Sequence, residues 1–205
     1  MAEDGVREDF NVIQAATLTL LALIVGFTFS MALNRYDQRK NYEEEEANAI
    51  GTEYLRASLL PAADATKVRA LLISYLDQRI AFYEALDRQE LLKIAAQTAK
   101  AQSELWAAVQ VPAVAQPTPT VTLAVAGMND VFNSQGYTQA AWWNRIPIAA
   151  WGLMAAIAIC SNVLVGYSAR RPKEEFALLL ILRLVVSIAF FLIADIDSRA
   201  AGLSL

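Results

Sequence analysis

The sequence predicts an all-α integral membrane helical protein with three transmembrane helices and a long extramembrane antiparallel helical hairpin. Three observations lead to this fold class. Hydrophobic residues make up 56% of the chain and gather in separate segments, which is unusual for a soluble domain. Residues 10–34 contain no charge and no proline, and a helix of that length crosses ~30 Å of hydrocarbon. No glycine or proline interrupts residues 62–111, which predicts long helices outside the membrane.

The first predicted transmembrane helix covers residues 10–34 and follows an acidic tail of residues 1–9. We expect this helix to be retained, because no signal-peptide cleavage site follows the apolar run. Small side chains recur along it at alternating steps of four and three, which predicts a stripe where another helix backbone approaches closely. The stripe consists of Ala15, Thr19, Ala22, Gly26 and Ser30.

A neighbouring stripe of the same helix is more polar and carries Gln14, Thr17 and Thr28. Such side chains either face water in a pore or bond to a neighbouring helix or to their own backbone. We therefore assign these three residues to a candidate anion path, and bonding within the bundle is the alternative.

Residues 35–111 predict an extramembrane helical stalk. Nothing breaks the first helix until Pro61, so it continues beyond the bilayer. Residues 62–111 then form one long helix, or two with a bend near Arg88, that packs back on this extension as an antiparallel hairpin. The four adjacent glutamates at 43–46 go round a helix, which favours a solvated surface over a cation site.

Residues 112–146 predict a proline-rich linker followed by a short amphipathic helix. The linker runs to Val121, and the helix covers residues 121–133. Trp142 and Trp143 are typical of side chains that anchor a membrane helix at the level of the lipid headgroups. We expect the second span to begin directly after them.

The second and third spans, residues 148–169 and 176–194, belong to a C-terminal segment of residues 147–205. Because only a short charged loop separates them, they form an antiparallel pair. Three spans put the two ends of the chain on opposite sides of the bilayer. The basic residues that flank the membrane are nearly balanced between its two sides. We place the stalk in the cytoplasm and the chain, as a multi-pass protein, in the cell inner membrane.

Arg183 lies about nine residues into the third span, roughly 13 Å deep by helical rise. No acidic residue lies deep in any span, and Ser161 and Asn162 reach a similar depth across the loop as neutral partners. Three interpretations remain open. Arg183 fixes the bundle by bonding carbonyls, Asn162 or a neighbouring subunit; it faces a water-filled path and attracts an anion; or it extends to the interface.

Composition excludes several kinds of chemistry. The chain has no histidine, which removes imidazole-based haem and zinc sites and nucleophiles paired with histidine. Cys160 is the single cysteine, so no intrachain disulfide forms. A net charge of -4 gives no reason to expect nucleic acid as a partner. We expect no cofactor, no metal site and no catalytic residue, and therefore not an enzyme.

Five segments carry a family resemblance: Gly26 to Arg39, Glu44 to Pro61, Met128 to Asp130, Arg145 to Pro147 and Phe191 to Ser198. They resemble the bestrophin-like domain family of bacterial integral membrane proteins and occur in the right order. The resemblance implies distant kinship with bestrophins, which are pentameric anion channels with four membrane helices per subunit. It thus implies a homo-oligomer, a pentamer by analogy, that lies in the lipid bilayer and conducts small anions such as chloride.

Two of these segments also predict contacts. Asn48 and Gly51 lie on the extension of the first helix, where they permit close or polar packing, and we expect an assembly surface there. Asp195 and Asp197 end the third span near the level of Arg35 and Arg39, which predicts a salt bridge.

The leading hypothesis is a homo-oligomeric bestrophin-like anion channel. One subunit with three spans is too thin to enclose a water-filled path, so a channel requires several copies around an axis. The alternative is a non-conducting scaffold or adaptor whose helical stalk binds a protein partner. A membrane enzyme is a weaker third hypothesis, because the only acidic cluster, residues 43–46, has no evident companion.

Overall fold

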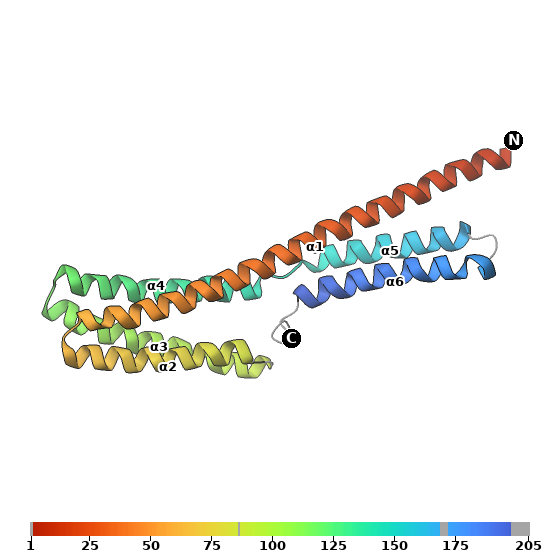
Figure 1. Ribbon diagram of the computed structural model, residues 1–205. Helices are drawn as coiled ribbons and strands as arrows, with labels where there is room; N and C mark the ends of the chain where they lie inside the picture. Colours follow the sequence, from red (N-terminus) through yellow and green to blue (C-terminus); the bar gives the residue numbers. More distant parts are fainter. Residues whose placement is uncertain (1, 86, 169–171, 198–205) are drawn as a thin grey trace. The chain divides into compact units, whose positions relative to one another are not determined.

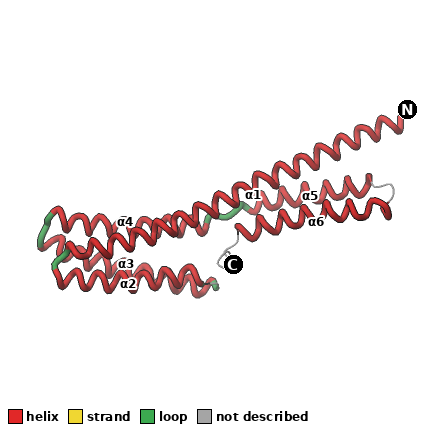
Figure 2. The backbone as a smooth tube through the Cα atoms, in the orientation of Figure 1, coloured by secondary structure: helices red, strands yellow, loops and turns green. Residues whose placement is uncertain are grey.

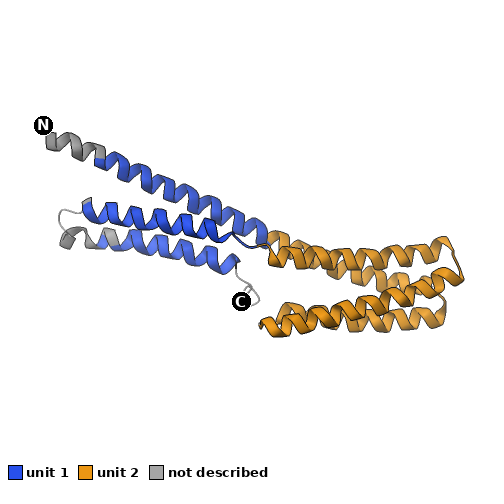
Figure 3. Ribbon diagram, turned by 180° about the vertical axis from the view of Figure 1, so that it is seen from behind, with its two compact units in different colours: residues 1–36, 145–198 blue, residues 37–144, 199–205 orange. Residues whose placement is uncertain are grey.

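The computed structural model describes residues 2–85, 87–168 and 172–197, and these residues are almost wholly helical (Figure 2). The helices are α1 (Ala2–Arg56), η1 (Ala57–Leu59), α2 (Ala62–Glu84), α3 (Arg88–Ala115), α4 (Pro119–Trp143), α5 (Ile148–Ser168) and α6 (Pro172–Asp197). The chain divides into two compact units (Figure 3). Among the described residues, unit 1 draws on the ranges 2–36 and 145–197, and unit 2 draws on the range 37–144.

Helix α1 contributes residues to both units, and one stripe of it is buried along much of its length. The buried residues recur at steps of three, four or seven, as expected for one face of a helix. They are Leu21, Thr28, Ala32, Arg39, Glu46, Ile50 and Glu53, and Ala57 at the start of η1 continues the same spacing. The acidic tail expected at residues 1–9 is part of the same helix from Ala2 on, where α1 begins.

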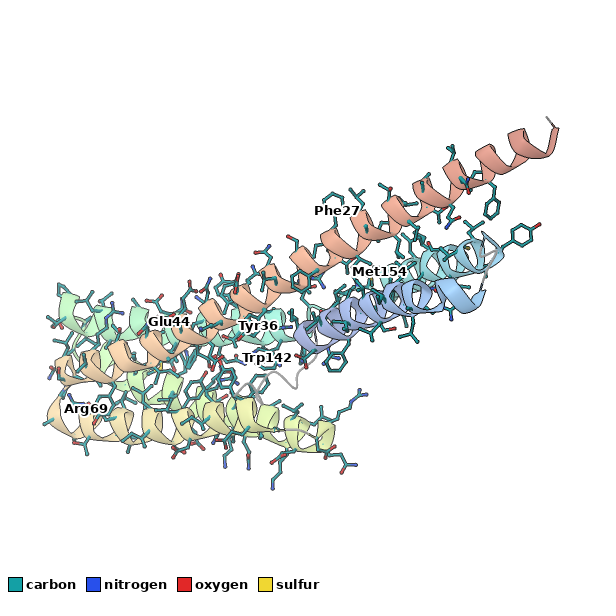
Figure 4. The ribbon with its side chains drawn as sticks, turned by 45° about the vertical axis from the view of Figure 1, so that its right-hand side comes forward. Phe27, Tyr36, Glu44, Arg69, Trp142 and Met154 are labelled. Carbon is teal, nitrogen blue, oxygen red and sulfur yellow. The ribbon has the colours of Figure 1, made fainter. Side chains whose placement is uncertain are left out.

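In unit 1 the first part of α1 is accompanied by α5 and α6, which run side by side in opposite directions (Figure 1). Its small core contains Ala32, Ile146, Met154 and Ile193. Met154, which Figure 4 labels, is completely buried there. The antiparallel pairing predicted for the last two apolar segments is thus present in this unit. The residues between α5 and α6, 169–171, and the C-terminal tail from 198 lie outside the described residues.

Two of the described helical segments, Phe10–Leu59 and Pro119–Tyr167, contain stretches long and apolar enough to cross a membrane. Only 11% and 17% of these stretches are buried, whereas the core helix of a soluble protein would be mostly buried. Phe27 on α1 illustrates this, because its side chain is 63% exposed (Figure 4). The third predicted span corresponds to α6, and its insertion in the bilayer stays a prediction.

Unit 2 is a bundle of four helical segments, formed by the second part of α1 together with α2, α3 and α4 (Figure 1). Its core draws on all four segments through Ile50, Leu72, Leu105 and Met128. Of the two predicted alternatives for residues 62–111, the single long helix is not present, because α2 and α3 are separate helices, and α4 completes the bundle. The reason is that an apolar face on each segment needs covering, and four amphipathic segments achieve this together.

The break between α2 and α3 agrees with the alternative of two helices near Arg88. Ala85 and Asp87 both have extended backbone, with ψ angles of 123° and 142°, so the chain reverses there. Helix α3 returns antiparallel along α2 (Figure 1).

The predicted linker and short helix of residues 112–146 are corrected by the structure. Helix α3 continues to Ala115 with Pro112 inside it, and α4 extends from Pro119 to Trp143. Pro112 is tolerated because it lies in the last turn and is buried, and its carbonyl still accepts a hydrogen bond from the Gln116 N–H at 2.9 Å. Pro119 stands at the helix start, where no N–H is needed.

Candidate functional site

Arg183 is exposed on α6 in unit 1, and no ion pair or hydrogen bond joins it to another described residue. It lines a wide-open surface cavity of about 620 Å³ between α5 and α6, together with Asn162 and Ser187. The rest of the lining is mainly apolar: Ala155, Ala158, Ile159, Val186 and Phe190. The structure therefore brings Arg183 and Asn162 to one cavity, as their similar predicted depth suggested.

The two neutral residues predicted beside Arg183 have other roles. The Asn162 side-chain amide donates to the Ala158 carbonyl at 2.8 Å, so part of its hydrogen-bonding capacity is used within α5. Ser161 is 2% exposed, and its hydroxyl has no partner among the described residues. Ser161 is also not part of the lining of the Arg183 cavity. Of the two, only Asn162 is placed to contact something that occupies this cavity.

The polar stripe of α1 is engaged mainly with its own helix. The Thr17 hydroxyl donates to the Ile13 carbonyl at 2.7 Å, and the Thr28 hydroxyl donates to the Ile24 carbonyl at 2.8 Å. Gln14 is half-buried. Backbone bonding, the alternative to a water-facing role, is therefore present for both threonines.

The stripe of small residues on α1 is uncovered within the chain. All five members, Ala15, Thr19, Ala22, Gly26 and Ser30, are exposed. A Cβ placed on Gly26 would meet no atom within 4 Å. Ala22 and Gly26 also line an apolar groove of about 460 Å³ shared with α6. The close helix contact predicted for this stripe is not made by the described part of the same chain.

Asn48 and Gly51 in unit 2 are likewise exposed. A Cβ on Gly51 would also meet nothing within 4 Å. Glu46 and Ile50, in the same segment of α1, point into the bundle instead. The segment thus presents one face to its own unit and leaves the predicted assembly face uncovered.

Asp197 at the end of α6 connects three parts of unit 1. Both of its carboxylate oxygens accept from the Ile146 backbone N–H at 3.2 Å, and its Oδ1 lies 3.9 Å from Arg35 Nη1. The salt bridge predicted between the helix ends is thus confirmed for Arg35. The part of this prediction that concerns Arg39 and Asp195 stays a prediction. Arg39 is buried, and its guanidinium lies 5.9 Å from the centre of the ring of Trp142, which Figure 4 labels.

Unit 2 contains a buried ion pair that the sequence analysis missed. Glu46 on α1 and Arg79 on α2 are 1% and 3% exposed, and both nitrogens Nε and Nη2 of Arg79 donate to the carboxylate. The Tyr83 hydroxyl donates to Glu46 Oε2 at 2.8 Å. The Arg79 guanidinium also lies over the Phe82 ring, 4.4 Å from its centre. Burial lowers the pKa of Arg79, but the hydrogen bonds and charge of Glu46 outweigh this, and the net pKa is raised.

The solvated surface that the sequence predicts for the acidic run at 43–46 is wrong for Glu46, which is buried. Position 46 falls on the buried stripe of α1, whereas Glu44 and Glu45 are exposed (Figure 4 labels Glu44). The spacing of seven residues from Arg39 to Glu46 and from Glu46 to Glu53 was a signal that could have revealed this.

Glu53 is a second buried acidic residue on the same stripe. It is 0% exposed, and neither carboxylate oxygen has a hydrogen-bond partner among the described residues. It packs against Gly127 of α4, where an added Cβ would overlap Glu53 Oε2 and lie 2.5 Å from Arg56 Nη1. Burial raises the pKa of Glu53 to about 8, with Arg56 acting to lower it and Asp130 to raise it. Arg56 in turn pairs with Asp130 at 3.6 Å.

Comparison with known proteins adds one match. A family model described as Bestrophin-like domain matches residues 8–198, a range that includes α5, the described part of α6 and all of unit 2 up to Asn144. No curated protein and no solved structure matches the chain.

Proposed function

We propose, because the chain belongs to the bestrophin-like domain family, that it is a homo-oligomeric channel for small anions such as chloride. The match to the family model confirms the family resemblance predicted from its motifs. The family and the two apolar, largely uncovered helical stretches make it a membrane protein. In this proposal it spans the inner membrane with α1, α5 and α6, its bundle of four helical segments lies in the cytoplasm, and it is not an enzyme.

One observation carries the proposal: the exposed guanidinium of Arg183, which has no ionic partner among the described residues. An arginine near the middle of a bilayer costs at least ~2.5 kcal/mol on insertion scales. The remaining lining of its cavity offers only the polar side chains of Asn162 and Ser187. A water-filled path between subunits would hydrate the guanidinium, and its positive potential would concentrate anions there.

Several copies are needed because one subunit cannot surround a path. The uncovered faces of α1 supply the contact surfaces in this proposal. In unit 1 these are the exposed small residues around Gly26, and in unit 2 they are Asn48 and Gly51. Small residues permit close approach of helix backbones and so increase the van der Waals packing that helps to drive helix association in lipid. Kinship with bestrophins makes five the expected subunit number.

Two measurements test the proposal. Native mass spectrometry of the purified protein should show a closed oligomer, and liposomes that contain it should release chloride. Arg183→Gln should reduce the flux at least tenfold while the oligomer persists, and Arg183→Lys should retain part of it. Arg88→Gln, an exposed arginine of unit 2, is the matched control and should conduct normally. A stable monomer, or an intact oligomer in chloride-tight liposomes, would contradict the proposal.

A scaffold is the second candidate, favoured by an apolar row on the surface of unit 2. Ile73, Leu76 and Ile80 follow helical spacing on α2 and are 51%, 37% and 47% exposed. Such a row suits the apolar face of a partner helix. A stoichiometric partner that is lost on Leu76→Lys, together with liposomes that show no flux, would favour the scaffold over the channel.

A further inference from the structure

The contact between α1 and α4 in unit 2 contains a buried carboxyl group, that of Glu53, whose oxygens have no hydrogen-bond donor among the described residues. Glu53 is completely buried, and its two oxygens accept no hydrogen bond from a described residue. An ionised carboxylate in such a place loses its hydration and gains no hydrogen bond in return, and the nearby charge of Arg56 offsets only part of this loss, whereas the neutral acid loses much less. Glu53 therefore holds a proton at neutral pH, which agrees with its raised pKa of about 8.

Gly127 makes this arrangement possible. The space that a side chain would occupy at position 127 is filled by Glu53 Oε2 and by Arg56 Nη1. The carboxyl and the guanidinium thus reach the same point on the surface of α4. A larger residue at this position would push both groups away from α4.

Arg56 stands between two carboxyl groups. It pairs with Asp130 of α4 at 3.6 Å, where its side chain is 34% exposed and that of Asp130 is 66% exposed. Arg56 and Asp130 are the charged groups that act on Glu53 among the described residues. Arg69, on α2, is occupied elsewhere: it donates to the Tyr54 carbonyl at 3.2 Å and lies over the Tyr54 ring (Figure 4 labels Arg69).

The local charge is balanced only while Glu53 is neutral, because one arginine then faces one ionised aspartate. Loss of the proton to solvent leaves two carboxylates and one guanidinium at the same contact. The Arg56 guanidinium then stabilises the buried Glu53 carboxylate more than the Asp130 carboxylate, since Asp130 remains hydrated when it is unpaired.

We propose that Glu53, Arg56 and Asp130 form a protonation switch on the contact between α1 and α4. With Glu53 protonated, Arg56 bridges to Asp130 and α4 is held against α1 at Gly127. When Glu53 releases its proton to water, the Arg56 guanidinium moves from Asp130 to Glu53, and the bridge to α4 is lost. The α1–α4 contact then loosens around Gly127. The switch belongs to unit 2 and does not depend on anion conduction.

Infrared spectroscopy tests the protonation state directly, since the C=O stretch of a neutral carboxyl is separate from the carboxylate bands. The purified full chain should show this band at pH 7, and the band should disappear with a midpoint near pH 8. Glu53→Gln should abolish this titration. Glu104→Gln, which removes an exposed carboxyl paired with Lys100 at 3.8 Å, should leave it unchanged.

A second variant keeps the test valid if Glu53→Gln does not fold. Asp130→Asn alters a mainly exposed side chain, so the bundle should tolerate it. It removes the negative charge that opposes ionisation of Glu53 and frees Arg56 to pair with it. The midpoint of the carboxyl band should therefore shift to lower pH by roughly 0.5 to 1 unit.

Hydrogen exchange tests the structural half of the switch. Amides of α4 around Gly127 should exchange at least fivefold faster above the midpoint than below it, after correction for the intrinsic effect of pH. In Glu53→Gln this increase should be absent. The proposal is overturned if Glu53 is already ionised at pH 7, or if it titrates while exchange in α4 stays the same.

Discussion

The Glu46 carboxylate and the Arg79 guanidinium form a buried ion pair that joins α1 to α2 in unit 2. Two hydrogen bonds from Arg79 and one from the Tyr83 hydroxyl satisfy the carboxylate. A buried pair gains little over a well-packed apolar pair, because both charges lose their hydration. It does, however, penalise any packing that separates the two partners, so it favours one register of α1 on α2.

Arg79→Met should destabilise unit 2 strongly, because it leaves the Glu46 charge buried without a counter-charge. The expected loss is about 3–5 kcal/mol in the free energy of unfolding, measured by denaturation in detergent. The double variant Glu46→Leu with Arg79→Met should recover most of this loss. If the double variant is as unstable as the single one, desolvation of an unpaired charge is not the cause. Lys100→Met, at an exposed pair, should cost at most about 1 kcal/mol.

Gly127→Ala should be destabilising by roughly 1–3 kcal/mol, because the added methyl group overlaps Glu53 Oε2. Gly136→Ala is the matched control on the same helix. A Cβ at position 136 meets nothing within 4 Å, and alanine there should stabilise α4 by about 0.5–1 kcal/mol. Thermal unfolding measures the change in stability of both variants. Changes of equal size and direction would contradict the close approach at Gly127.

The stability of unit 2 should fall as the pH rises between about 4.5 and 8, because of Glu53. Its pKa rises from 4.5 to about 8 on folding, so the folded chain binds more protons than the unfolded chain in this range. The stability that protonation of Glu53 contributes is complete below pH 4.5 and is lost as the pH rises through 8. The free energy of unfolding should fall by at most about 1.4 kcal/mol per pH unit in this range. Glu53→Gln should remove this slope from melting curves recorded at several pH values, whereas Glu104→Gln should retain it.

Asp197→Ala should loosen the junction of α5 and α6 in unit 1. The change leaves the Ile146 N–H without its carboxylate acceptor, at a cost of about 1–3 kcal/mol. Amide exchange at Ile146 should accelerate at least tenfold. Asp87→Ala, at an exposed residue before α3, should have no effect there. Unchanged protection of the Ile146 amide would show that Asp197 is not its essential partner.

Gly26→Leu should disrupt assembly and not the fold of the single chain. A Cβ at this position meets no atom within 4 Å, and the groove of about 460 Å³ beside Gly26 leaves room for a longer side chain. A neighbouring helix packed on the small stripe would be displaced by the larger side chain. Native mass spectrometry should therefore show smaller species at unchanged helix content by circular dichroism. Gly152→Leu, an equally open position on α5, should keep the full oligomer.

Much of the architecture could be predicted from local pattern. The apolar segments that became the first part of α1, α5 and α6 are visible because length and absence of charge are properties of a single stretch of chain. The depth shared by Arg183 and Asn162 follows from helical rise on either side of one loop, and the structure places both at one cavity. The family, too, could be recognised from short motifs in order.

The linker of residues 112–146 shows where local pattern misleads. Prolines at 112 and 119 are signals for a break, yet one is accommodated in the last turn of α3 and the other starts α4. Packing of Thr138 and Ala141 in the bundle extends α4 to Trp143. Tertiary contacts thus override a weak local preference against helix.

The amino-acid sequence by itself determined that this chain is helical, that parts of it enter lipid and that it carries one arginine deep in an apolar segment. Only the tertiary structure decided that Glu46 and Glu53 face inward and that Arg79 and Gly127 meet them. Helical periodicity acts over neighbouring turns and can be read along the chain. The partner of a buried charge comes from another helix, and packing selects it because an unpaired charge cannot be buried without a large loss of hydration energy.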